Sequence, residues 1–309
     1  MGDKENKRIG ILVGREWDWP EAFMAAVNGR QANVTVELVK LGGTFMDTDI
    51  PYDLIIDRMS HEIPYYRAFL QYAASKGCYI INNPFTWSAD NRFFATIMAN
   101  RLGLRTPKTV ALPNKEIERD VVPESFRNLT YPMDWQGIID YVGVPAIFKD
   151  VRSGGRRQVY RVHTVNELIQ RFDESGTQTM ILQELIESDI HIHGFVIGQK
   201  DVLLLQYDHD NGRYFPGILS TKTTRNQFLT KASLDLTTAF GYDMNMVEFV
   251  IKGDQPYVIN STNPAPVIDR SLMSSEQFDW LVQQMVELTV VRVQRPLPQF
   301  TKNMFGNQD

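Results

Sequence analysis

The sequence predicts an α/β N-terminal domain followed by two α+β lobes, and three observations support this fold class. Buried-strand runs alternate with helix-like segments through the first third of the 309 residues. Strands separated in this way usually pair in parallel, with helices on the faces of the sheet. Later strands follow one another across short turns, which is typical of antiparallel pairing. Since domains usually contain about 100–150 residues, the chain is also long enough for more than one packed unit.

The N-terminal α/β domain is expected at residues 1–88. Its strands are expected at residues 9–13, 34–39, 52–57 and 79–84, and its helices at residues 20–27 and 65–76. Gly77 follows the second helix directly, where glycine commonly ends a helix.

The central lobe is expected at residues 89–180 and the C-terminal lobe at residues 181–309. In the central lobe we expect helices at 90–102 and 165–172, strands at 106–112, 144–149 and 159–162, and an irregular stretch at 114–136. A strand at 180–186 joins the lobes. In the C-terminal lobe we expect strands at 192–197, 202–207, 246–251 and 256–259, and helices at 233–240 and 275–293.

Composition narrows the class of function. The net charge is −5, and lysine and arginine are scattered, so the basic stripe of a nucleic-acid-binding protein is missing. Cys78 is the single cysteine, which excludes an internal disulfide, and its apolar surroundings predict a buried side chain. No apolar run approaches the ~20 residues that span a bilayer. We therefore expect no nucleic-acid or membrane partner, and the cytoplasm is the default compartment.

A candidate phosphate-binding segment begins where a buried strand ends at Lys149. The turn that follows contains Ser153, Gly154 and Gly155, and two arginines come next. Glycines let backbone N–H groups approach an anion closely, and a lysine adds a fixed positive charge. The segment alone is also compatible with a hairpin turn that carries solvated basic residues.

Two further segments carry polar residues on strands. In residues 180–186 the adjacent Gln183 and Glu184 interrupt an apolar strand, which is compatible with adenine recognition or with an ordinary edge strand. Glu248 lies on another apolar strand, and the Gly253-Asp254 pair after it predicts a hairpin. This hairpin would set Glu248 opposite the region 260–263, where oxygen ligands suit Mg²⁺ bound together with phosphates. A lone carboxylate in a strand can equally be salt-bridged or solvated.

Together, these segments have the order and spacing of the ATP-grasp superfamily, and the resemblance covers residues 9–269. It implies an ATP-grasp fold with a nucleotide cleft between the two lobes, and ATP and Mg²⁺ as cofactors. The implied nucleotide-binding residues are Arg92, Lys108, Lys149, Ser153, Gly154, Gly155, Gln183, Glu184, Leu185, Ile186, Asp189 and His191. The implied metal ligands are Glu248, Asn260 and Asn263.

The sequence departs from the family pattern at the second metal ligand. The family usually has a glutamate there, followed two residues later by asparagine, whereas this chain has Asn260 or Ser261, depending on the alignment. Within the superfamily the chain resembles RimK-like and glutathione-synthetase-like ligases, which phosphorylate a carboxylate with ATP and let an amine attack the acylphosphate. Lys222 and Arg225 lie where such enzymes need positive groups, so the resemblance implies a catalytic role for both; solvated loop charges are the alternative.

The leading hypothesis is therefore an ADP-forming carboxylate–amine ligase. Its partners would be small-molecule or peptide carboxylates and amines, with a homo-oligomer as a further option. The altered metal ligand motivates a second hypothesis, a nucleotide-binding regulatory protein of the same fold with little or no catalysis. A third is an α/β binding module or dehydrogenase. The alternating His191 and His193 share a strand face, but no third ligand has the spacing of a zinc site.

Overall fold

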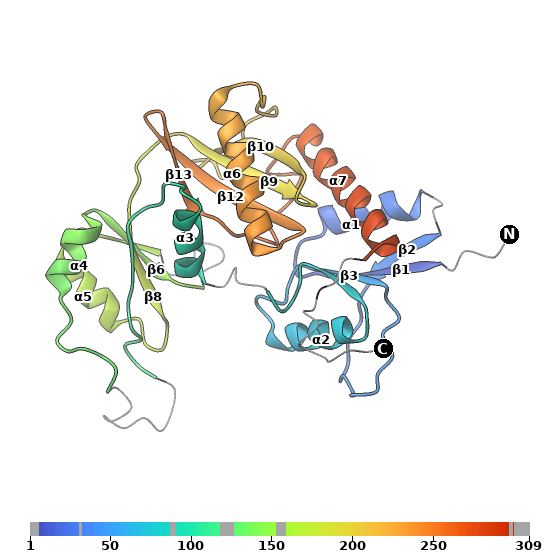
Figure 1. Cartoon of the computed structure of the whole chain (residues 1–309), viewed down its shortest axis with the longest axis horizontal. Coiled ribbons are helices and arrows are strands. Elements are labelled where there is room, and N and C mark those ends of the chain that lie inside the picture. The colour runs from blue at the N-terminus through green and yellow to red at the C-terminus, as the bar shows by residue number, and fades with distance from the viewer. Residues whose placement is uncertain are drawn as a thin grey trace. The chain divides into compact units, whose positions relative to one another are not determined.

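The computed structural model describes residues 6–30, 33–86, 91–117, 127–152, 159–296 and 299. The chain divides into two compact units (Figure 1). Unit 1 consists of Met1–Trp87, Ile192–Val247 and Asn263–Asp309, and unit 2 of Ser88–His191 and Glu248–Thr262. The three sequence segments expected above stay a prediction.

The N-terminal part of unit 1 is a four-stranded sheet with the order β2-β1-β3-β4. Its strands are β1 (Lys7–Leu12), β2 (Val34–Leu38), β3 (Leu54–Asp57) and β4 (Tyr79–Ile81), and its helices are α1 (Asp18–Asn28) and α2 (Pro64–Ser75). All three strand pairs are parallel, as the alternation of strands and helices predicted. Both faces of β3 are buried, which explains its unbroken run of apolar residues.

A second sheet has the order β11-β10-β9-β12-β13. Its strands are β9 (His191–Ile197), β10 (Asp201–Asp208), β11 (Arg213–Tyr214), β12 (Met244–Lys252) and β13 (Gln255–Asn260). The boundary between the units cuts β12 after Val247, so Glu248 and β13 belong to unit 2. Two further helices belong to unit 1: α6 (Thr224–Phe240) and α7 (Ser275–Gln294).

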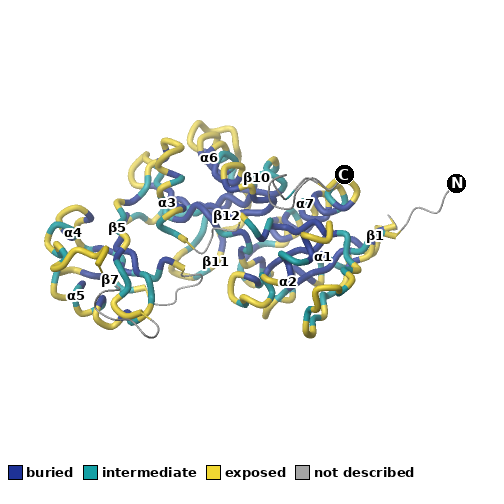
Figure 2. The backbone as a smooth tube through the Cα atoms, turned by 60° about the horizontal axis from the view of Figure 1, so that its bottom comes forward, coloured by how far each residue is buried: buried dark blue, intermediate teal, exposed yellow. Residues whose placement is uncertain are grey.

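The larger hydrophobic core of unit 1 joins α1 to α7. Trp19 and Phe23 of α1 stack on each other and pack with Phe278 and Met285 of α7 in the same cluster of buried side chains. Figure 2 shows the buried backbone concentrated along the strands, with exposed backbone at loops and at the outer sides of helices. At about 25 cal/mol per Å² of buried apolar surface, such a core is the main stabilising contribution to the unit.

Unit 2 is built on an antiparallel sheet with the order β5-β8-β6-β7. Its strands are β5 (Thr109–Ala111), β6 (Ala146–Asp150), β7 (Val159–Val162) and β8 (Met180–Glu184), and its helices are α3 (Arg92–Arg101), α4 (Trp135–Val142) and α5 (Val165–Asp173). Phe148 of β6 and Leu182 of β8 face the core that α4 and α5 complete. Because side chains alternate along a strand, Lys149 and Gln183 point to the other face of the sheet.

Three elements differ from the sequence prediction. Helix α6 begins at Thr224 rather than at residue 233, because its first two turns are largely polar and exposed and so lack an apolar period. Helix α4 was not predicted, since it has only eight residues and follows a stretch rich in proline and asparagine. Strand β11 has two residues, too few for a periodic pattern.

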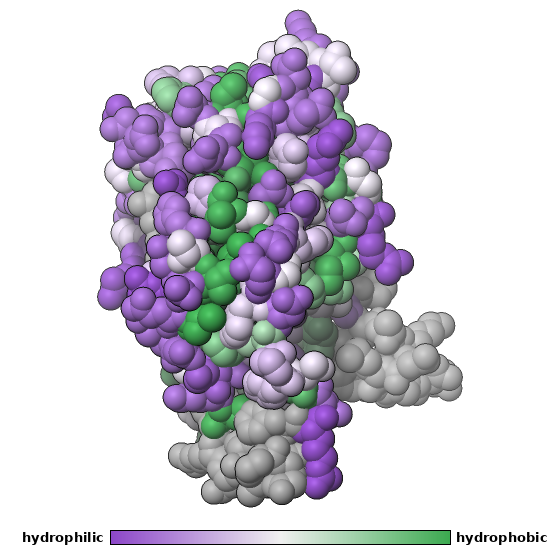
Figure 3. All heavy atoms as spheres, turned by 90° about the vertical axis from the view of Figure 1, so that its left-hand side faces the viewer, coloured by the Kyte–Doolittle hydropathy of each residue, from purple (hydrophilic) through white to green (hydrophobic). Residues whose placement is uncertain are grey.

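Hydrophobic side chains also gather on the surface where α4 and α5 lie in Figure 1, and they form a broken band among hydrophilic ones (Figure 3). A cavity of about 420 Å³ in unit 2 is lined by Val110, Thr130, Pro132, Met133, Asp134, Gly137, Ile138 and Tyr141. Asp134 caps the N-terminus of α4 by accepting a hydrogen bond from the backbone of Gly137. No helix among the described residues is long and apolar enough to cross a membrane.

Candidate nucleotide site

The antiparallel register of unit 2 brings Lys149 to Gln183. Ile147 of β6 lies directly opposite Gln183 of β8, and Lys149 is two residues further along the same face. The Lys149 Nζ donates a hydrogen bond of 2.8 Å to the Gln183 Oε1. Gln183 is buried, so this contact is shielded from water. Among the described residues, the hydrogen-bond acceptor of Lys149 on the sheet is therefore an amide oxygen.

Thr109 fixes the other end of the Gln183 side chain. Thr109 lies opposite Gln183 in the β5–β8 pair, and the Gln183 Nε2 donates to its Oγ1 over 3.0 Å. The sequence prediction did not single out Thr109. The strand register could have pointed to it, because directly paired residues share a face.

Helix α3 places Arg92 beside the end of β6. Asn91 caps the helix by accepting a hydrogen bond from the backbone of Phe94, and the Arg92 N–H donates to the Val151 carbonyl over 3.0 Å. The N-terminus of a helix carries a partial positive charge and favours anions. Both Arg92 and the end of this helix thus add positive potential close to Lys149.

The carboxylate of the site comes from the β12–β13 hairpin. Glu248 pairs with Asn260, as the Gly253-Asp254 turn predicted, and the Asn260 Nδ2 donates 2.8 Å to the Glu248 Oε1. Hydrogen bonds tie this hairpin to the rest of unit 2, among them two to α3 and the stretch after it. The Val258 N–H donates to the Arg105 carbonyl, and the Ser261 hydroxyl donates to the Ala95 carbonyl of α3.

Burial lowers the pKa of both cations, Lys149 and Arg92. Burial, together with the nearby Arg92, lowers the pKa of Lys149 to about 8, and Glu248 opposes this shift. Burial also lowers the pKa of Arg92, opposed by Glu248 and Asp150. A cation whose charged form is disfavoured in this way gains most from an anionic ligand that restores a counter-charge.

Both cations line one small crevice of unit 2 with Gln183 and Asn260, and Glu248 lies beside it, hydrogen-bonded to Asn260. Its lining consists of Arg92, Ala95, Thr96, Lys149, Gln183, Val258, Ile259, Asn260 and Ser261. Basic side chains, a helix N-terminus and amides in one crevice are the groups that bind phosphate oxygens. Thr96 and Ser261 were not among the residues predicted from the sequence.

The donor set fits a magnesium ion only in company with phosphates. No group of three or more His, Cys, Asp or Glu residues that could hold a metal occurs in the described part of the chain. Glu248 and Asn260, on two adjoining strands, carry oxygen atoms of the kind that Mg²⁺ prefers, and in this structure the Asn260 NH₂ group is the one turned to Glu248. Because Mg²⁺ usually keeps few protein ligands and shares phosphate oxygens, this pair fits a metal bound together with a nucleotide.

The predicted adenine-binding segment follows β8. Glu184 accepts a hydrogen bond from the Lys108 N–H, and the Lys108 ammonium lies 5.5 Å from the centre of the Tyr141 ring. The segment continues through the partly buried Leu185 and the buried Ile186 to the exposed Asp189. His191 lies within 3.0 Å of the Ser188 carbonyl. The roles assigned to these residues stay predictions.

The remaining predicted site residues belong to unit 1 or lie outside the described residues. Asn263 belongs to unit 1, where its N–H donates to the Asn245 side chain and its carbonyl accepts from Met246. Lys222 and Arg225 are exposed at the N-terminal end of α6 in the same unit, and Arg225 lies in its first turn. Ser153, Gly154 and Gly155 lie outside the described residues.

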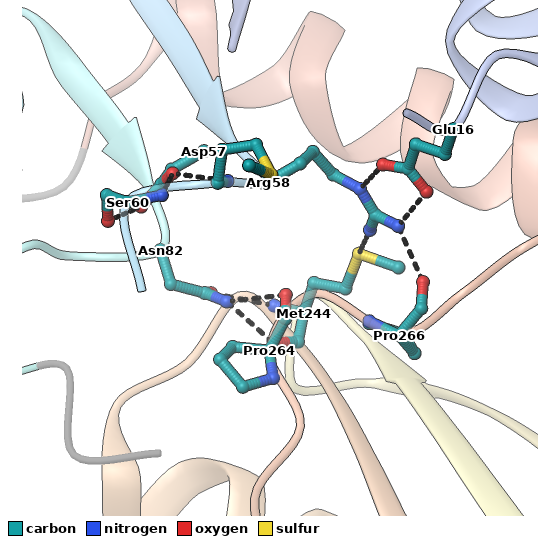
Figure 4. A network of polar contacts seen from close by, with 9 residues as sticks. Glu16, Asp57, Arg58, Ser60, Asn82, Met244, Pro264 and Pro266 are labelled. Carbon is teal, nitrogen blue, oxygen red and sulfur yellow. Dashed lines mark hydrogen bonds and ion pairs between the residues drawn. The ribbon is translucent and has the colours of Figure 1, made fainter. Parts of the chain in front are cut away.

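A second polar network lies in unit 1, at the carboxyl ends of β3 and β4 (Figure 4). Arg58 is buried; its Nη2 donates to Glu16 over 2.7 Å and to the Pro266 carbonyl, and its guanidinium stacks 5.0 Å from the Trp19 ring. Asn82 is fully buried, and its amide makes hydrogen bonds to Met244 and other backbone groups. Every donor and acceptor of the Asn82 amide is used within the protein.

Comparison with solved structures decides the fold. A RimK domain protein ATP-grasp from Sphaerobacter thermophilus is similar over 92% of this chain and 99% of its own, with 16% identity and a TM-score of 0.67. The VanG D-Ala:D-Ser ligase from Enterococcus faecalis is similar over 94% of this chain and 100% of its own, with 13% identity and a TM-score of 0.66. The chain has an ATP-grasp fold.

A third ATP-grasp neighbour is the macrocyclase MdnC bound with precursor peptide MdnA, from Microcystis aeruginosa. It is similar over 92% of this chain and 99% of its own, with 12% identity and a TM-score of 0.62. No protein-family model matches the sequence. No curated protein matches it either. The relationship is thus visible in the arrangement of the elements and very weak in residue identity.

Proposed function

We propose that this ATP-grasp chain binds a magnesium nucleotide in the crevice of unit 2 and uses ATP to join a carboxylate to an amine. The observation that supports the proposal is that Arg92, Lys149 and Asn260, from three separate stretches of sequence, line one crevice, while Glu248 is hydrogen-bonded to Asn260. Structural neighbours complexed with ATP, or with Mg and ADP, support a nucleotide in this fold.

In the proposed complex the side chains of unit 2 bind and neutralise phosphate. Lys149 and Arg92 hold phosphate oxygens, and Gln183 keeps the Lys149 ammonium in place. Glu248 and Asn260 hold the magnesium ion, which would neutralise charge on the transferring phosphoryl group. The backbone of residues 183–186, the segment expected from the sequence, binds the adenine edge.

The proposed reaction has two balanced steps. An oxygen of the substrate carboxylate attacks the γ-phosphorus of ATP, and the bond to the leaving ADP oxygen breaks. The amine nitrogen then attacks the acyl carbon, and phosphate leaves with the bonding electrons while the nitrogen loses a proton. Such phosphoryl transfer depends mainly on positioning and charge neutralisation. We assign binding of the carboxylate to Lys222 and Arg225, on the family resemblance.

The test is release of ADP from ATP in the presence of amino acids and short peptides, each as carboxylate and as amine. We expect release with one pair of substrates and Mg²⁺. The Glu248→Ala variant should lose release by at least about tenfold, because it removes the carboxylate of the metal pair. Asp173→Ala is the matched control, since it removes an exposed carboxylate of the same unit that pairs with Lys115.

Two results would contradict the proposal. Equal release by the Glu248→Ala and Asp173→Ala variants would remove Glu248 from the metal pair. Stabilisation of the protein by ATP without ADP release from any substrate pair would favour the nucleotide-binding regulatory protein. The structural feature that supports this alternative is Asn260, an amide where the family usually has a second carboxylate. Thermal shift measures that stabilisation, because a ligand that binds the native state raises its apparent stability.

A further inference from the structure

A chain of three hydrogen bonds runs across the sheet of unit 2 and ends at Lys149. The Thr109 hydroxyl donates to the Pro107 carbonyl over 3.0 Å, the Gln183 Nε2 donates to the Thr109 Oγ1 over 3.0 Å, and the Lys149 Nζ donates to the Gln183 Oε1 over 2.8 Å. We call this set, from Pro107 to Lys149, the Thr109 relay. All its members lie in unit 2.

The relay fixes which end of the Gln183 amide faces the lysine. A hydroxyl has one proton, and Thr109 gives it to the Pro107 carbonyl. Towards Gln183 the hydroxyl can therefore only accept, so the amide must turn its NH₂ group to Thr109. The Gln183 carbonyl oxygen is then directed at the Lys149 ammonium.

The opposite orientation would be unfavourable for a cation. If the Gln183 amide were flipped, its NH₂ group would face the Lys149 ammonium, and two sets of donors would oppose each other. Gln183 is 5% exposed, so little water is available to compensate for the lost hydrogen bond. The position of the ammonium thus depends on a hydroxyl on a different strand.

We propose that Thr109 is a positioning residue of the nucleotide site: through Gln183 it holds the Lys149 ammonium where it binds phosphate. This inference rests on the proposed function and adds a residue to it. If the inference is correct, the Thr109 hydroxyl affects nucleotide affinity only when position 183 carries an amide. The reason is that an amide has one donating and one accepting end, so its orientation matters.

The test is a double-mutant cycle on ADP affinity, measured by calorimetry in EDTA so that metal binding plays no part. Thr109→Val removes the hydroxyl with little change of shape, and we expect affinity to fall about two- to tenfold, the effect of one hydrogen bond. Thr109→Ser keeps the hydroxyl and should restore most of the affinity. In the Gln183→Glu background, where the two carboxylate oxygens are equivalent, Thr109→Val should have no effect on affinity.

Thr179→Val is the matched control, because the Thr179 hydroxyl of the same unit donates to Asn114 and not to the relay. An effect of Thr109→Val that persists in the Gln183→Glu background, or an equal effect of Thr179→Val, would overturn the relay and leave the proposed function standing. Absence of ADP binding by the unaltered protein would instead overturn the nucleotide site itself.

Discussion

Arg58 of unit 1 and Lys149 of unit 2 both lie next to the end of a strand, yet their partners differ. Arg58 has a carboxylate partner, Glu16, and further contacts with a carbonyl and a ring. Lys149 donates a hydrogen bond to an amide, and Glu248 raises the pKa of Arg92 as well as that of Lys149. A buried charge with its own counter-ion is neutralised within the protein, so loss of either partner is costly, whereas a cation held by an amide is suited to a ligand that brings negative charge.

The largest expected effect is a loss of stability when Arg58 is replaced. Replacing Arg58 with Met should lower the free energy of unfolding by about 3–5 kcal/mol, because Glu16 loses its partner in a poorly solvated position. Chemical denaturation measures this change. Arg8→Met, which breaks the more exposed pair with Glu37, should cost less than about 1 kcal/mol. If Arg58→Met and Arg8→Met lower the free energy of unfolding by similar amounts, the Arg58–Glu16 pair does not behave as a buried ion pair.

Replacing Lys149 should instead affect nucleotide affinity more than stability. The Lys149→Met variant should change little in stability, because removal of a desolvated charge offsets the hydrogen bond that the buried Gln183 oxygen loses. It should bind ADP about 10- to 150-fold more weakly, the loss of one charge-assisted hydrogen bond. Lys115→Met is the control, because Lys115 pairs with Asp173 outside the crevice. A destabilised Lys149→Met variant with unchanged ADP affinity would make Lys149 a structural residue like Arg58.

The pH dependence of ADP affinity sharpens the same contrast. Burial and Arg92 lower the pKa of Lys149 to about 8, so below pH 8 the free protein already carries the charge that the phosphate needs. Above pH 8 binding must take up a proton, and affinity should fall by up to about tenfold per pH unit. Lys149→Arg should remove this dependence, because arginine stays charged. A flat profile for the unaltered protein would contradict a role for the Lys149 charge.

The smallest expected effect concerns the metal pair. Asn260→Asp would set a second carboxylate against Glu248, and without Mg²⁺ the free energy of unfolding should fall by about 0.5–1 kcal/mol, because like charges on paired strands repel. Mg²⁺ with ADP should restore that loss, which thermal melts with and without the ion can measure. No added stabilisation by Mg²⁺ would place the metal away from Glu248 and Asn260.

Local patterns predicted the parts of the fold and site that depend on neighbouring residues. The lysine at the end of β6 and the Glu248–Asn260 pairing follow from an apolar run and a Gly-Asp turn, and both are confirmed as geometry. The start of α6 was wrong because the Thr223 cap lies before a polar first turn, which lacks the apolar period that marks a helix.

Contacts between distant residues could not be read in the same way. Asn82 reaches Met244 across 162 positions, and Arg58 reaches Pro266 across 208. Such contacts depend on how whole helices and strands pack, and a local sequence pattern does not predict that packing. Thr109 is an intermediate case, since its role follows once the register of β5 and β8 is known.

The composition of unit 2 from two stretches of chain has a practical consequence for expression of fragments. A polypeptide that stops at residue 191 retains Lys149, Gln183 and Thr109 but lacks the stretch 248–262, and with it Glu248, Asn260 and the tether of Val258 to Arg105. Truncation from the C-terminus would therefore separate Arg92 and Lys149 from Asn260 in the crevice and from Glu248 beside it. To express unit 2 alone, the stretch 248–262 must be joined to the stretch 88–191, by circular permutation or by a linker.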